Sequence, residues 1–131
     1  MSRDAYVPLA LALFAAACGG SSPTTPSTPP SSGGNSATTI TISASGVSPK
    51  TITVTLGARV TFVNGDSRSH DMTSDPHPDH TDCPELNQVG FLTAGQSRES
   101  GNLVTVRTCG FHDHDQPSNA NLKGTITIRS Q

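Results

Sequence analysis

Hydrophobic and polar residues alternate with a period of two in several short segments after residue 37. In residues 51–56 (TITVTL) the hydrophobic positions are Ile52, Val54 and Leu56, and threonines occupy the positions between them. This period is typical of β-strands that bury one face and expose the other. The pattern predicts strands at residues 38–43, 51–56, 60–63, 91–92, 104–109 and 124–128.

Turn-forming residues separate these candidate strands. Gly46-Val47-Ser48-Pro49 interrupts the first alternating run, and Asn64-Gly65-Asp66 follows the third;. No segment has a helical period longer than one turn, and no internal repeat is present. Short strands at intervals of about 8–12 residues predict an all-β sandwich or barrel.

The composition agrees with a single small β-rich domain. The 131 residues include no Trp, one Tyr and four Phe, so the core must consist mainly of aliphatic side chains;. The 8 Lys and Arg residues nearly balance the 10 Asp and Glu residues. This balance provides no basic surface of the kind that binds nucleic acid, and we expect no nucleic-acid partner.

The N-terminal segment predicts export. The apolar run from Tyr6 to Ala17 is too short to span a bilayer and ends in small residues, as a signal peptide does;. The sequence Ala15-Ala16-Ala17-Cys18-Gly19 resembles a bacterial lipobox, which implies that Cys18 is lipidated and becomes the first residue of the mature protein. The alternative is an ordinary secretory signal that is cleaved nearby.

The segment after Cys18 predicts a tether. Residues 19–37 consist almost entirely of Ser, Thr, Pro and Gly, which cannot form a buried core;. We therefore divide the chain into a signal peptide (1–18), a disordered tether (19–37) and a folded domain (38–131). The lipid anchor predicts attachment to a bacterial membrane, with the domain facing the periplasm or the cell exterior.

The histidines predict a metal site. All five lie in two segments, one at residues 67–90 and one just after a candidate strand; they are His70, His77, His80, His112 and His114. The second segment also contains Cys109, so a thiol and two imidazoles fall within six residues. A thiolate and imidazoles together are typical copper ligands.

The cysteines allow a second interpretation. If Cys18 is lipidated, Cys83 and Cys109 are the only cysteines of the folded domain, and two cysteines in an exported domain commonly form a disulfide;. Cys109 is therefore either a copper ligand or the disulfide partner of Cys83. With the disulfide, the site would consist of imidazoles and carboxylates, which suit Cu(II) or Zn(II).

The order of these segments resembles that of the cupredoxins, the plastocyanin and azurin family of small copper proteins. The resemblance covers residues 38–131 and depends on the strands at 47–64, on Ser69-His70, on residues 91–97, and on Cys109, His112 and the last strand. It implies a Greek-key β-sandwich and one copper ion bound by His70, Cys109 and His112. It also implies a monomer that carries single electrons to a redox partner protein.

The ligand segment departs from the family pattern in one respect. The axial methionine that usually follows the second histidine is missing, since the only methionines are Met1 and Met72. We expect His114 to be the axial or the alternative equatorial ligand. His77 and His80 are secondary candidates that cap this site or form a second one.

Two other functions remain open. One is a copper or zinc carrier without a redox role, with a Cys83–Cys109 disulfide and a histidine-rich site. The other follows from Gly110-Phe111-His112-Asp113-His114, which resembles a segment of Cu/Zn superoxide dismutases, although the order of the metal segments is reversed here;. No apparatus for acyl, phosphoryl or glycosyl transfer is recognisable, so we expect an electron carrier or a metal-binding module rather than an enzyme.

Overall fold

The computed structural model describes residues 38–131. The predicted signal peptide, Cys18 and the tether lie outside the described residues. Among the residues described, no helix is both long enough and apolar enough to cross a membrane.

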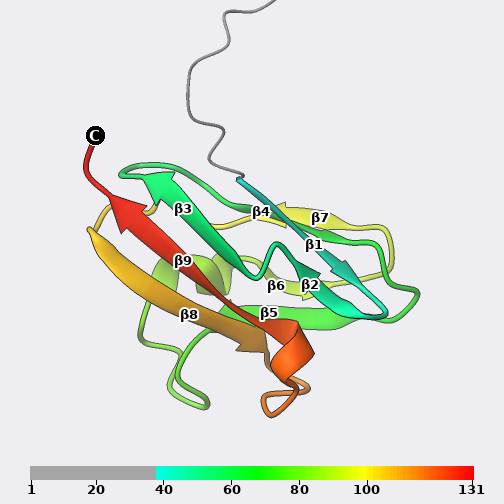
Figure 1. The fold of residues 1–131 in the computed structure, drawn as a ribbon. Helices are drawn as coiled ribbons and strands as arrows, with labels where there is room; N and C mark the ends of the chain where they lie inside the picture. Colours follow the sequence, from blue (N-terminus) through cyan, green and yellow to red (C-terminus); the bar gives the residue numbers. More distant parts are fainter. Residues whose placement is uncertain (1–37) are drawn as a thin grey trace, which may run out of the picture. The chain divides into compact units, whose positions relative to one another are not determined.

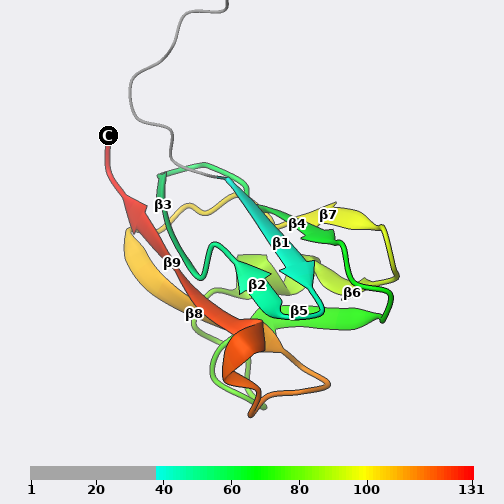
Figure 2. The same ribbon diagram turned by 45° about the vertical axis from the view of Figure 1, so that its right-hand side comes forward.

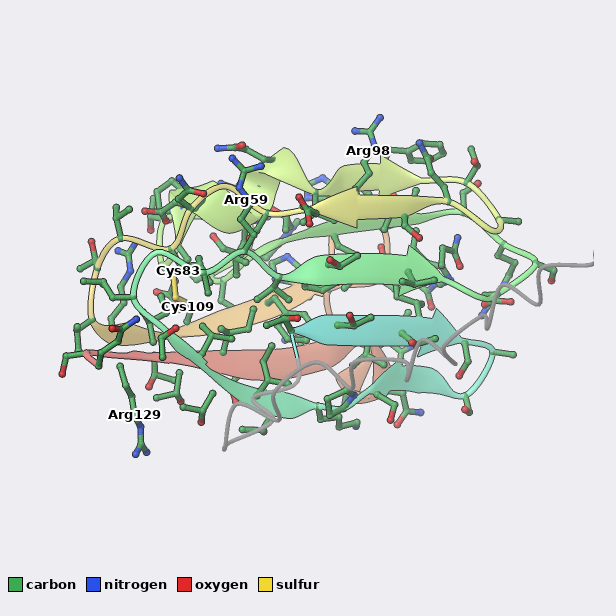
Figure 3. The ribbon with its side chains drawn as sticks, turned by 90° about the horizontal axis from the view of Figure 1, so that it is seen from above. Arg59, Cys83, Arg98, Cys109 and Arg129 are labelled. Atoms are coloured by element: carbon green, nitrogen blue, oxygen red, sulfur yellow. A yellow bond between two sulfur atoms is a disulfide. The ribbon has the colours of Figure 1, made fainter. Side chains whose placement is uncertain are left out.

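The described chain forms two β-sheets that pack face to face (Figures 1 and 3). One sheet has the strand order β2-β1-β4-β7 and the other has the order β3-β9-β8-β5-β6. Two short 3-10 helices, η1 (Pro84–Gln88) and η2 (Ala120–Leu122), lie in the connections. The strands are β1 (Thr39–Ser43), β2 (Gly46–Ser48), β3 (Thr51–Thr55), β4 (Thr61–Asn64), β5 (His70–Ser74), β6 (Gly90–Leu92), β7 (Ser97–Glu99), β8 (Arg107–Asp113) and β9 (Lys123–Arg129).

The alternating pattern of the sequence places one side of each strand in the core. In β3 the threonines are exposed while Ile52 and Val54 are buried, and β9 shows the same alternation at Ile126 and Ile128. Burial of these aliphatic side chains between the sheets is the main favourable contribution to folding. The prediction of an all-β sandwich is therefore confirmed.

Several segments differ from the prediction. Residues 46–48, predicted to interrupt the first strand, form β2, and residues 67–89, where no strand was predicted, include β5 and η1. The expected alternation is missing in β5 because both of its faces are covered, which leaves four of its five residues buried. The strand expected to end at Cys109 continues as β8 to Asp113, hydrogen-bonded to β5 and β9 on its two sides.

The side chains of β8 point alternately into the sandwich and to the outer side of the sheet. Phe111 meets Phe62 of the opposite sheet in an edge-to-face contact, with 5.3 Å between ring centroids. Successive side chains of a strand point to opposite faces. Asp113 therefore faces the interior of the sandwich with Phe111, while Gly110 and His112 face the outer side of the sheet.

Candidate metal centre

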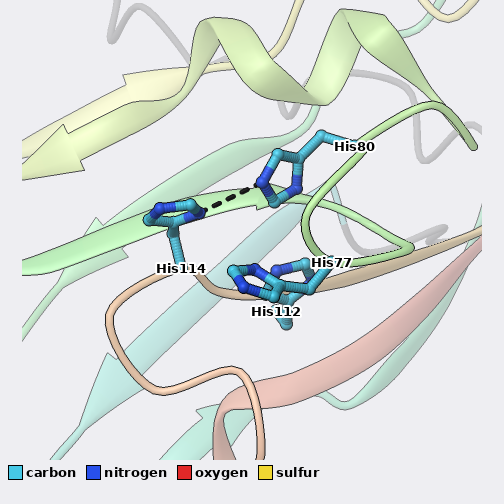
Figure 4. Close-up of side chains that lie close together, drawn as sticks. All are labelled: His77, His80, His112 and His114. Atoms are coloured by element: carbon cyan, nitrogen blue, oxygen red, sulfur yellow. Dashed lines mark hydrogen bonds between the residues drawn. The ribbon is translucent and has the colours of Figure 1, made fainter.

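Four histidine side chains gather on the outer side of β8 (Figure 4). Their possible ligand nitrogens all lie within 4.8 Å of one another. His112 belongs to β8 and His114 follows it directly, whereas His77 and His80 come from the loop between β5 and η1. Figures 1 and 2 show this loop, in green, on the same side of the domain as the orange turn after β8.

The imidazole of His112 is buried, with 1% of its side chain exposed. Its Nδ1 lies 2.5 Å from Oδ1 of Asp75, so the carboxylate accepts a hydrogen bond from the Nδ1–H group. The Nε2 atom is buried and has no hydrogen-bond partner among the described residues. A buried polar atom without a partner is destabilising, and a metal ion bound to this nitrogen would remove the penalty.

Gly110 allows Asp75 to approach His112. A Cβ atom at position 110 would collide with the Asp75 carboxylate, which lies directly over this glycine. The backbone N–H of Asp75 also donates to the carbonyl oxygen of Gly110 at 3.0 Å. The absence of a side chain at Gly110 thus lets the loop carboxylate reach the outward-facing imidazole two residues farther along β8.

His80 is held in position by three hydrogen bonds of the loop. Its Nδ1 donates to the carbonyl oxygen of Ser74 at 2.9 Å, which leaves Nε2 free to accept or to bind a metal;. Its backbone N–H donates to the carbonyl of Pro76, and its own carbonyl accepts from Nδ2 of Asn87. The backbone of His80 has φ 53°, a left-handed conformation that costs a non-glycine residue about 1–2 kcal/mol;. Strain of this kind is concentrated at functional sites.

The other two histidines are exposed. Nδ1 of His114 lies 3.1 Å from Nε2 of His80, and its backbone N–H donates to the carbonyl of Asp71 at 2.7 Å. The ring centroid of His77 is 5.1 Å from that of His114. Desolvation by neighbouring groups, followed by the positive charges of His114, His112, His80 and Lys123, lowers the pKa of His77 below its ordinary 6.5. A lowered pKa favours the neutral imidazole, which is the form that binds metals.

The structure places Cys109 outside this group. It forms a disulfide with Cys83, so its sulfur is not a thiolate (Figure 3). The expectation that Cys109 and His112 bind one ion is also at odds with β8, in which residues three positions apart point to opposite faces;. Of the two interpretations of Cys109, the structure shows the disulfide.

His70 is also separate from the four histidines. It is fully buried in the sandwich, and both of its ring nitrogens contact carboxylates: Nδ1 lies 2.7 Å from Asp113 and Nε2 lies 3.1 Å from Asp66. No nitrogen of His70 is left for a metal ligand bond. Of the expected set of His70, Cys109, His112 and His114, the structure brings only the last two together, and their neighbours are the secondary candidates His77 and His80.

Comparison with known proteins identifies the fold of the domain. No family model matches the chain, and no curated protein matches it significantly. Solved structures do match. A purple cupredoxin from Nitrosopumilus maritimus is 20% identical, with 70% of this chain and 98% of that chain covered and a TM-score of 0.54. The oxidised plastocyanin of Dryopteris crassirhizoma is 23% identical, with coverage of 70% and 99% and a TM-score of 0.54.

A third match is an amicyanin mutant in its Cu(I) form, 16% identical, with coverage of 70% and 80% and a TM-score of 0.51. The domain has the cupredoxin fold. The expectation of a cupredoxin-type sandwich is therefore confirmed. At these identities the similarity shows the fold alone.

Proposed function

We propose that this domain binds one copper ion through His77, His80, His112 and His114. The buried, unpartnered Nε2 of His112 within a group of four converging imidazoles supports the proposal most directly. Imidazole nitrogens suit both copper and zinc, and among divalent first-row metals Cu²⁺ binds such donors most tightly. Zinc is the second candidate for the same four ligands.

The surrounding residues are of the types that support metal ligands. A carboxylate or carbonyl on the second imidazole nitrogen fixes the tautomer and orientation of a ligand and makes it a stronger base. Asp75 would do this for His112, and the carbonyl of Ser74 would do it for His80. Bound copper would supply a centre that can exist as Cu(I) or Cu(II).

The exposure of the site favours a carrier. His77 and His114 are exposed, so a bound ion would be accessible to a ligand from another molecule. The disulfide removes the only sulfur expected at the site, and with it the thiolate on which a blue-copper centre depends;. We therefore infer that the domain holds copper and exchanges it with a partner.

One-electron transfer to a redox partner is the second candidate function. It is favoured by the fold, which this domain shares with plastocyanin and with the Cu(I) form of an amicyanin mutant. A dismutase role is disfavoured by exposed carboxylates beside the histidines, since they would repel an anionic substrate; these are Asp79, Asp82 and Asp115;. Export and lipid anchoring through Cys18 complete the proposal and are supported by the sequence alone.

Calorimetric titration of the metal-free protein with Cu(II) tests the proposal. We expect one tight site per chain, which His112→Ala and His80→Ala each weaken by at least 100-fold. Asn119→Ala removes the N-cap of η2 but none of the four histidines, so this variant is the control and should bind as the wild type does. A wild-type protein without a stoichiometric site, or full affinity in both histidine variants, would refute the four-histidine site. Parallel titration with Zn(II) decides between the two metals.

A further inference from the structure

A buried cluster of charged side chains lies on the inner side of β8, opposite the histidine group. It consists of Asp66, His70 and Asp113, whose side chains are 3%, 0% and 0% exposed. His70 lies between the two carboxylates, with Nδ1 2.7 Å from Oδ2 of Asp113 and Nε2 3.1 Å from Oδ2 of Asp66. The two contacts use both ring nitrogens of His70, so this one side chain joins the two buried carboxylates;.

The first end of the cluster is fixed to the loop between β4 and β5. Oδ1 of Asn64 accepts the backbone N–H of Asp66 at 2.9 Å, and Oδ1 of Asp66 accepts the backbone N–H of Ser67 at 2.7 Å. Arg68 donates to Oδ2 of Asp66 from both Nε and Nη2. Burial by itself would raise the pKa of Asp66, but the hydrogen bonds from His70, Arg68 and Ser67 outweigh it and lower the pKa from 3.8 to about 2.

The other end of the cluster is fixed to the turn that carries His114. Oδ1 of Asp113 accepts the backbone N–H of Asp115 at 3.0 Å and that of Asp71 at 3.3 Å. The backbone N–H of His114 donates to the carbonyl of Asp71 at 2.7 Å. The residue between the two ligands His112 and His114 is therefore connected to β5 through both its side chain and the backbone that follows it.

We propose that Asp66, His70 and Asp113 form a positioning cluster that holds His112 and His114 in the geometry needed to bind the metal. The inference rests on the proposed function, because it assigns these residues a role toward the same four-histidine site. In this account His70 acts on the metal through Asp113 and the turn. The sequence suggested His70 as a copper ligand, but both of its ring nitrogens contact carboxylates in the interior of the sandwich.

Two variants of the full chain test the proposal. His70→Gln keeps a polar side chain of similar size but cannot bridge both carboxylates. Asp66→Asn removes the charge at the far end of the cluster and leaves every direct contact of the ligand turn in place, and His70 is the side chain that joins Asp66 to Asp113. Ile128→Val is the control, because Ile128 is buried in β9 opposite Arg107, at the other end of β8.

Two readouts are needed. The first is hydrogen exchange of the backbone N–H groups of His114 and Asp115 in the metal-free protein. The second is the affinity and the electron paramagnetic resonance spectrum of bound Cu(II). We expect His70→Gln to speed up both exchange rates and to weaken Cu(II) binding about ten-fold or more, with altered copper hyperfine coupling. Asp66→Asn should change the same quantities in the same direction, and Ile128→Val should change neither.

Unchanged exchange and an unchanged copper spectrum in Asp66→Asn and in a folded His70→Gln would overturn the positioning role. If His70→Gln does not fold, Asp66→Asn decides the matter alone. A wild-type protein that binds no Cu(II) would refute the proposed function, while the exchange rates in the metal-free protein would still show whether the cluster holds the turn.

Discussion

Nδ1 of His112 lies 2.5 Å from Oδ1 of Asp75, and this contact joins the central strand of one sheet to the loop that brings His77 and His80 over it. It determines that Nε2 is the nitrogen of His112 directed at the histidine group. The consequences of this pairing can be tested by substitution.

Replacing Asp75 by Asn should weaken Cu(II) binding by about 10–100-fold, because the amide is a poorer acceptor for the Nδ1–H group of His112. Calorimetric titration measures the change. Asp79→Asn, in the same loop but exposed, is the matched control and should bind as the wild type does. Equal affinities in the two variants would show that Asp75 does not support the site.

Gly110→Ala should remove the contact between Asp75 and His112, because the added Cβ would displace the Asp75 carboxylate. We expect a loss of Cu(II) affinity similar to that of Asp75→Asn. In the double variant the two losses should not add, since both act on one contact. Additive losses in this double-mutant cycle would mean that Gly110 acts by another route.

His80→Gly should separate metal binding from stability. Glycine relieves the left-handed backbone strain at position 80, which is about 1–2 kcal/mol, but loses the hydrogen bond to the Ser74 carbonyl, which contributes about 1 kcal/mol;. The free energy of unfolding of the metal-free protein should therefore stay within about 1 kcal/mol of the wild type, as measured in urea. Stoichiometric Cu(II) binding should be lost, and its retention would remove His80 from the ligand set.

The low pKa of Asp66 predicts a pH-dependent stability. This pKa is about 2 in the folded protein and 3.8 ordinarily, so the unfolded chain binds the proton more tightly;. The associated stability is fully present above about pH 4 and is lost as the pH falls towards about 2. Urea unfolding at a series of pH values should show this decrease, and Asp66→Asn should make the curve flatter in that range. An identical slope in the variant would contradict the assignment.

Replacing both Cys83 and Cys109 by Ala should reduce stability without removing the metal ligands. The two cysteines are 26 residues apart, and loss of a cross-link of that length costs about 3 kcal/mol;. The free energy of unfolding measures the cost. Cu(II) should still bind with an all-nitrogen spectrum, because neither sulfur belongs to the histidine group. Complete loss of binding in a folded variant would require a role for these cysteines at the metal.

The two-sheet fold could be predicted because exposed threonine alternates with buried Ile or Val in β3 and β9. The strand β5 could not, because both of its faces are covered and its sequence has no period. The surroundings of His70 could not be predicted either. A sequence does not show which carboxylates will surround an imidazole, and Asp113 is 43 positions away.

More of the histidine group could have been predicted from the sequence. His112 and His114 were recognised, and the pair His77 and His80 was identified but ranked second to His70. Cys109 and His112 are three positions apart. In a strand that continues past Cys109 their side chains point to opposite faces, so this spacing argues against both of them binding one ion. Only the register of β8 with β5 shows that the strand does continue.

We propose four histidines and no cysteine as the copper ligands. The absorption and pulsed electron paramagnetic resonance spectra of the protein loaded with one equivalent of Cu(II) test this ligand set most directly. We predict a pale sample whose copper couples to imidazole nitrogens, with coupling lost in His112→Ala and kept in the Cys83→Ala, Cys109→Ala double variant. An intense sulfur-to-copper charge-transfer band that disappears in the cysteine variant would contradict the account.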